Sequence, residues 1–153
     1  MGSYRRFGLM ILVSTLVMYG LMYLNTYQLD HVHFSQTRAW MALVMGAAMA
    51  VVMLAFMWGM YKEKRVNAAI VAVAVLAFAA SLWLVRSQST VDDVSYMRAM
   101  IPHHSIAIMT SERARISDAR VRKLADGIAA TQRKEIAEME ALIADIERRG
   151  PQK

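Results

Sequence analysis

Three long apolar segments fill the first half of the chain, and two amphipathic helical patterns fill the second. The apolar segments cover residues 7–27, 39–61 and 67–85, and each is long enough to cross a hydrocarbon core of about 30 Å as a helix. Apolar residues then recur at helical spacing through residues 91–116 and 118–148. No strand pattern and no glycine-rich phosphate loop is present. The sequence therefore predicts an all-α chain.

The change of character near residue 87 divides the chain into two predicted domains. Residues 1–86 form a three-span membrane domain, and residues 87–153 form an antiparallel helical hairpin. Ser117 and Asp118 have the chemistry of an N-cap for the second hairpin helix, and Gly150 with Pro151 ends it. A hairpin of this size buries little surface by itself. We expect it to pair with a second copy as a four-helix bundle, or to pack on the membrane-proximal loop.

The basic residues predict how the spans are oriented. Arg5 and Arg6 precede the first span, three cations lie between the second and third, and the first loop holds only Arg38. Positively charged loops stay in the cytoplasm, and an odd number of spans takes the following domain to the other side. We expect the inner (cytoplasmic) membrane of a bacterium, with a cytoplasmic N-terminus and a periplasmic or extracellular C-terminal domain.

Composition excludes several classes of function. The chain has no cysteine, so disulfides, thiolate metal sites and cysteine nucleophiles are excluded. The net charge of +6 is mostly membrane-flanking, and the cations form no stripe interleaved with aromatic residues, so nucleic acid is not an expected partner. No Ser/His/Asp order and no Glu-x-x-His motif of a di-iron bundle is present, and we expect no enzyme activity.

The segment Met97 to Met109 carries the strongest chemical signal. Met97, Met100 and His104 fall on one helix face, and His103 adjoins them. Thioether and imidazole donors together suit Cu(I) better than Mg²⁺, Ca²⁺ or structural Zn²⁺. Pro102 removes a backbone hydrogen bond and is expected to kink the helix or restart it. The alternative interpretation is that the histidines cap a helix or hydrogen-bond within the bundle.

The second hairpin helix can complete this site. Met139, with Glu135 and Gln132, recurs at three- or four-residue spacing and would face the first helix. A packing seam with a polar edge explains the same spacing. Met109 lies on another part of the helical wheel, where packing is the better interpretation, and it is a lesser candidate ligand.

These motifs resemble a known family. Met100-Ile-Pro-His-His104, then Ala107-Ile108, and later Gln132-x-x-Glu135-Ile136-x-x-Met139 are similar to the family labelled domain of unknown function 305, over roughly residues 90–148. The resemblance implies a ferritin-like helical fold and copper binding outside the cytoplasm, in some members linked to copper resistance. Where that family commonly has a methionine, this chain has Thr110, with Met109 one place earlier.

Two further features have competing interpretations. Asp30, His31 and His33 lie in the first loop, on the same expected side as the hairpin, as an auxiliary metal site or an ordinary polar loop. Methionines recur every fourth residue in the second span, at Met41, Met45, Met49, Met53 and Met57. They would pass Cu(I) along the span or fill helix interfaces, and the neighbouring small residues favour packing.

The sequence as a whole predicts a membrane-anchored copper-binding protein. We expect it to sequester copper, as Cu(I), or exchange it with a donor or acceptor protein. Imidazole must be neutral to bind metal, so binding should weaken as the pH falls through about 6.5. The alternative is a metal-free structural or assembly subunit that docks a partner through the hairpin, and a transporter ranks third.

Overall fold

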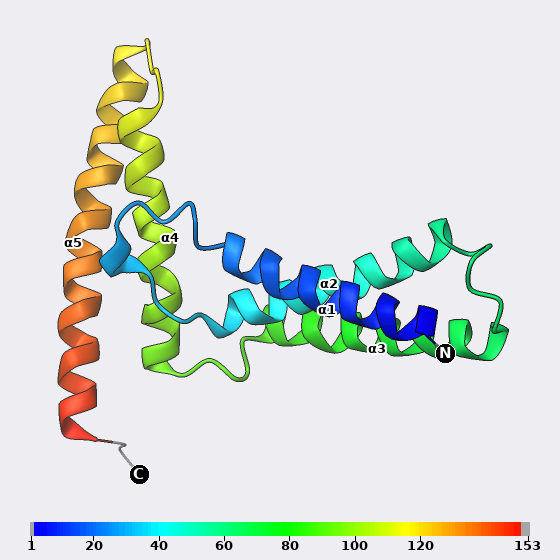
Figure 1. Ribbon diagram of the computed structural model, residues 1–153. Coiled ribbons are helices and arrows are strands. Elements are labelled where there is room, and N and C mark those ends of the chain that lie inside the picture. The colour runs from blue at the N-terminus through cyan, green and yellow to red at the C-terminus, as the bar shows by residue number, and fades with distance from the viewer. Residues whose placement is uncertain (1, 151–153) are drawn as a thin grey trace. The chain divides into compact units, whose positions relative to one another are not determined.

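The apolar segments form three helices in the computed structural model, which describes residues 2–150. Helix α1 spans Gly2–Leu21, α2 spans Gln36–Phe56 and α3 spans Lys64–Ser87. Helices α4, Asp93–Arg113, and α5, Ala119–Arg149, follow them (Figure 1). The described part of the chain contains no strand, and the prediction of an all-α chain is confirmed.

The described residues divide into two compact units that do not follow chain order. One unit contains α1, α2 and α3. The other contains the α4–α5 hairpin together with residues 23–35, the loop between α1 and α2. A short 3₁₀ turn, η1, spans Leu29–His31 within this loop. The loop that carries Asp30, His31 and His33 therefore belongs with the hairpin.

The first apolar segment stops being helical earlier than its hydrophobicity predicts. The predicted span runs to residue 27, but α1 ends at Leu21. The residues beyond it make contacts that a continued helix would not allow. The Ser35 amide donates to the Tyr23 hydroxyl at 3.1 Å, and the Tyr27 amide donates to Ser105 Oγ at 3.0 Å.

Two helices are long and apolar enough to cross a membrane, by length and composition. These are α2 and α3, and only 22% and 11% of their most apolar stretches are buried. Helix α1 is not apolar enough over a comparable length, because it includes Arg5 and Arg6 and ends at Leu21. The structure thus supports two of the three predicted spans. The exposed apolar sides of α2 and α3 are compatible with a lipid environment.

A small core joins the ends of the three membrane-unit helices. Phe7, Leu54 and Tyr61 are buried together with alanines of α2 and α3. The Tyr4 hydroxyl donates to Asn67 Oδ1 at 2.9 Å, and Asn67 Nδ2 donates to the Tyr61 carbonyl at 2.8 Å. Asn67 is only 1% exposed, and these bonds satisfy its amide.

The small residues of α2 let α1 approach it closely. A Cβ atom built on Gly46 would lie 2.4 Å from Thr15 Oγ1, which is closer than any real contact. The buried residues of α2 are Ala42, Gly46, Ala47, Ala50 and Leu54, whereas Met41 and Met45 are exposed. Further along the series, Met53 and Met57 are half-buried and pack against the core of this unit. The close approach at Gly46 and the packing of Met53 and Met57 are what the packing interpretation predicts.

Both hairpin helices begin at an aspartate cap. Asp92 Oδ1 accepts from the Ser95 amide at 2.7 Å at the start of α4. Asp118 Oδ1 accepts from the amides of Arg120 and Val121, which confirms the predicted cap of α5. Gly150 follows α5 with a φ of 72°, while Pro151 lies outside the described residues.

The two helices run antiparallel and enclose one apolar seam (Figure 1). Its buried core consists of Met97, Ile101, Ile108, Ile136 and Ile143. Ion pairs between the helices close it at two levels, Arg98 with Glu147 at 2.5 Å and Arg133 with Glu112. The seam fixes which side chains of α4 face α5, and this determines the geometry of the candidate site.

Candidate metal centre

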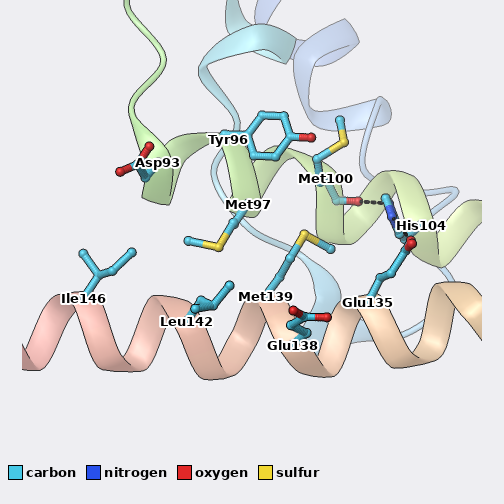
Figure 2. Close-up of a pocket in the computed structure, with 10 residues that line it drawn as sticks. All are labelled: Asp93, Tyr96, Met97, Met100, His104, Glu135, Glu138, Met139, Leu142 and Ile146. Atoms are coloured by element: carbon cyan, nitrogen blue, oxygen red, sulfur yellow. Dashed lines mark hydrogen bonds and ion pairs between the residues drawn. The ribbon is translucent and has the colours of Figure 1, made fainter.

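A groove between α4 and α5 contains most of the side chains that the sequence proposes as ligands. Its volume is about 530 Å³. Figure 2 shows the ten lining residues. They are Asp93, Tyr96, Met97, Met100 and His104 from α4, and Glu135, Glu138, Met139, Leu142 and Ile146 from α5. Methionine, histidine and carboxylate side chains thus meet on an otherwise apolar surface.

His104 is held in one orientation. Its Nδ1 lies 3.0 Å from the Met100 carbonyl oxygen, which can only accept, so Nδ1 carries the proton and donates (Figure 2). This assigns the lone pair of a neutral ring to Nε2. Nε2 lies 2.8 Å from Glu135 Oε2. The backbone bond on one nitrogen therefore directs the other nitrogen into the groove.

Glu135 forms the polar side of the groove. Its Oε2 also accepts from Gln132 Nε2 at 3.2 Å. The Glu135 side chain is 45% exposed, whereas the His104 side chain is 16% exposed. A carboxylate only accepts hydrogen bonds, so its contact with Nε2 requires one proton between the two groups. Glu135 has room to move away from Nε2 into solvent.

Two thioethers reach into the space between the helices. Figure 2 shows Met97 from α4 and Met139 from α5 extending into this space, while the Met100 thioether lies on the side of α4 away from α5. Met97 is buried, and Met139 is half-buried against the same apolar core. The groove therefore contains one sulfur from each helix in addition to the His104 imidazole.

The other predicted ligands of α4 lie elsewhere. His103 is exposed and does not line the groove, and its ring centroid is 6.1 Å from that of His104. Met109 is half-buried and also lies outside the groove. Successive helix residues point about 100° apart, so adjacent histidines cannot both face α5.

Pro102 is accommodated without interrupting α4. The helix is continuous from Asp93 to Arg113, so the expected restart at the proline does not occur. Pro102 is fully buried beside Ile101 and Ser105. Because proline has no amide hydrogen, the Arg98 carbonyl lacks its usual helical donor at this point.

The loop histidines occupy a second location on the same unit. Ser105 Oγ lies 2.9 Å from His31 Nδ1 and accepts from the Tyr27 amide. His33 is half-buried, and its Nε2 has no hydrogen-bond partner among the described residues. Burial and the nearby Arg98 guanidinium lower the pKa of His33 below its ordinary value. Asp30, His31 and His33 do not line the α4–α5 groove.

Ser105 is a structural residue that the sequence interpretation did not identify. It is 0% exposed and joins α4 to the loop through two contacts. The sequence feature that could have identified Ser105 is its position. It lies four residues after Ile101, on the same apolar stripe as Ile108. A polar side chain on a buried stripe needs a partner.

The groove offers a mixed donor set. Within residues 2–150, no three histidine, aspartate or glutamate side chains gather as a metal-binding group. Methionine thioethers can also bind soft metals, and in this groove they outnumber the imidazoles. The groove is lined by one imidazole, from His104, by the thioethers of Met97, Met100 and Met139, and by the carboxylates of Asp93, Glu135 and Glu138. Of these, the Met97 and Met139 thioethers extend between the helices, and Glu135 contacts His104. Such a set favours a soft cation over Mg²⁺ or Ca²⁺.

Comparison with known proteins supports the family resemblance for the hairpin. Residues 93–153 match the family described as Domain of unknown function (DUF305). An uncharacterized protein of Acanthamoeba polyphaga mimivirus is 39% identical over 64 residues, which is 40% of this chain and 42% of the viral protein. The chain thus spans less than half the length of this relative. No solved structure matches the chain.

Proposed function

Taking the family match of the hairpin as the premise, we propose that this protein is a membrane-anchored copper-binding protein. The hairpin groove binds copper as Cu(I) through His104, Met97 and Met139. The protein sequesters this copper or exchanges it with a partner protein. The observation that carries the proposal is the imidazole of fixed orientation that shares one groove with a thioether from each helix.

The chemistry of these donors fits Cu(I). Thioether sulfur is a soft ligand, and imidazole nitrogen is acceptable to copper. Ligating histidines usually donate their second ring N–H to a backbone carbonyl or a carboxylate, which holds the ring in place. The bond from His104 Nδ1 to the Met100 carbonyl, at 3.0 Å, has this form. The half-exposed Glu135 carboxylate is able to leave Nε2 when a metal takes its place.

The membrane unit supplies the anchor in this proposal. Helices α2 and α3 are suited to lipid by length and composition, and α1 with its N-terminal arginines is the third predicted span. With the basic ends in the cytoplasm, the hairpin lies on the outer side of the inner membrane. Copper bound there would stay outside the cytoplasm.

The test is competition for Cu(I) between the purified full-length protein and a chromogenic Cu(I) chelator, without oxygen. Two matched pairs of variants separate the groove from its surroundings. His104→Ala and Met139→Leu remove proposed ligands, whereas His103→Ala and Met109→Leu make the same changes outside the groove. We expect the first two to weaken binding at least tenfold, about 1.4 kcal/mol, and the controls to stay within about twofold.

Two results would contradict the proposal. Equal binding by all four variants and the unmodified protein would remove the groove as the copper site. Loss of helix content or assembly in His104→Ala, together with no copper binding by the unmodified protein, would instead favour the metal-free assembly subunit. Circular dichroism of each variant distinguishes lost ligation from lost structure.

A further inference from the structure

Helix α5 has two apolar faces, and α4 covers only one of them. Ala125, Ala129, Ile136 and Ile143 are buried against α4. A neighbouring stripe, which we call the outer face, carries Val121, Leu124, Ile128 and Leu142. These side chains are 48%, 64%, 41% and 46% exposed. Large apolar side chains aligned along a polar helix are typical of an interaction surface.

The outer face is hollowed in both halves of the helix. One hollow lies over the N-terminal half, where Gly127 has no side chain, and Leu124 and Ile128 line it. The candidate metal groove, with Met139 and Leu142 in its wall, lies over the C-terminal half. Each hollow is thus available to side chains of an opposing helix.

The charges of α5 are unevenly distributed, with a basic N-terminal half and an acidic C-terminal half. Residues 119–134 contain five cations and one acid, whereas residues 135–149 contain five acids and two cations. The helix dipole favours cations only near the C-terminus, where Arg148 and Arg149 lie, so it does not account for the cations of the first half or the acids of the second. Helix α4 has two acids and two cations, and among the described residues it pairs with only one charge in each half of α5, through Arg133–Glu112 and Arg98–Glu147.

We propose that the outer face of α5 pairs with the same face of a second copy of this chain, with the two α5 helices antiparallel. In this orientation the basic half of each helix opposes the acidic half of the other. A parallel pair would oppose like charges. Val121 and Leu124 of one copy then meet Leu142 and Met139 of the other, and Lys123 lies toward Glu138.

The pairing closes the candidate metal groove. Apolar side chains from the second copy lie over Met139 and Leu142 and exclude water from the space beside His104. This consequence rests on the proposed copper-binding function, whereas the pairing itself does not. The hairpin alone has one open side, and two copies form a four-helix arrangement with each groove covered.

Crosslinking tests the pairing in the full-length protein in lipid nanodiscs or detergent. The chain has no cysteine, so introduced thiols are the only reactive ones. Val121→Cys and Leu142→Cys are made singly and together, and each protein is treated with a short bismaleimide. Within one α5 these positions lie about 32 Å apart, too far for a short linker to join them.

We expect covalent dimers from the double variant and from a mixture of the two single variants, but not from either single variant alone. Dimers of Val121→Cys alone would indicate a parallel pair and overturn the proposal. An absence of dimers in every sample, with helix content retained, would also overturn it. Since crosslinking is read without copper, failure of the pairing and failure of the copper site are separate results.

A charge exchange provides an independent test. In the double-cysteine background, Lys123→Glu should reduce dimer yield severalfold because it opposes Glu138. Adding Glu138→Lys should restore the yield, since the opposed charges are again of opposite sign. A yield that is insensitive to both changes would contradict the antiparallel charge pairing.

Discussion

At the residue scale, His103 and His104 have different environments although they are adjacent in the sequence. His104 faces the groove with Nδ1 held by the Met100 carbonyl, while His103 is exposed. The sequence identifies the segment but treats both imidazoles as ligands. Which one faces α5 depends on the rotation of α4, and the burial of Ile101 and Ile108 determines that rotation.

Asp118 is the second residue whose role follows from its local contacts. Its side chain accepts from the Arg120 guanidinium and from two backbone amides, and these bonds lower its pKa from 3.8 to about 2. The folded state therefore binds the Asp118 proton less tightly than the unfolded chain. This contribution to stability is present above about pH 3.8 and is lost as the pH falls through about 2.

We predict that protection of the first turn of α5 from amide exchange decreases between pH 4 and pH 2 in the unmodified protein. Asp118→Ser is the matched control, because serine caps a helix but does not titrate. Hydrogen exchange across residues 119–123, compared between the two proteins, isolates Asp118 from other carboxylates. The same pH dependence in both proteins would show that another group is responsible.

At the element scale, helix type and order follow from the sequence, but the end of α1 and the position of the loop do not. Residues 22–27 carry no charge, which is why the predicted span extends to residue 27, but they include Asn25 and Thr26. After α1 ends at Leu21, the chain is held in the loop, where the Tyr27 amide donates to Ser105, a residue 78 positions away. The spacing of apolar residues is a local property of the sequence, so it cannot indicate a hydrogen bond between residues so far apart in the chain. The cap at Asp118 was predictable because capping is local to the sequence.

Ser105 should therefore control the loop. Ser105→Ala leaves the Tyr27 amide and His31 Nδ1 without their partner, and a lost buried partner costs about 1–3 kcal/mol. We predict faster amide exchange at residues 23–35, by tenfold or more, with α5 unchanged.

Ser111→Ala is the control for this substitution. Ser111 lies on the same helix and is also buried, but among the described residues its side chain does not hydrogen-bond to the loop. Protection of residues 23–35 from amide exchange should therefore be retained in Ser111→Ala. Equal acceleration in both variants would mean that α4 as a whole is destabilised, and no change in either would mean that Ser105 does not hold the loop.

At the scale of the whole molecule, copper handling outside the cytoplasm requires the hairpin to lie on the outer side of the membrane. Single cysteines in this cysteine-free chain report it directly. We predict that Ser117→Cys reacts with a membrane-impermeant maleimide in intact bacterial cells, whereas Lys62→Cys reacts only after the inner membrane is permeabilised. The reverse pattern would place the hairpin in the cytoplasm and contradict a role in handling copper outside it.

X-ray absorption of the Cu(I)-loaded full-length protein would show whether the groove binds Cu(I) through thioethers and one imidazole. We expect sulfur scatterers together with one imidazole, and loss of one sulfur in Met139→Leu but not in Met109→Leu. A first shell of nitrogen and oxygen alone, unchanged in Met139→Leu, would contradict the proposed site.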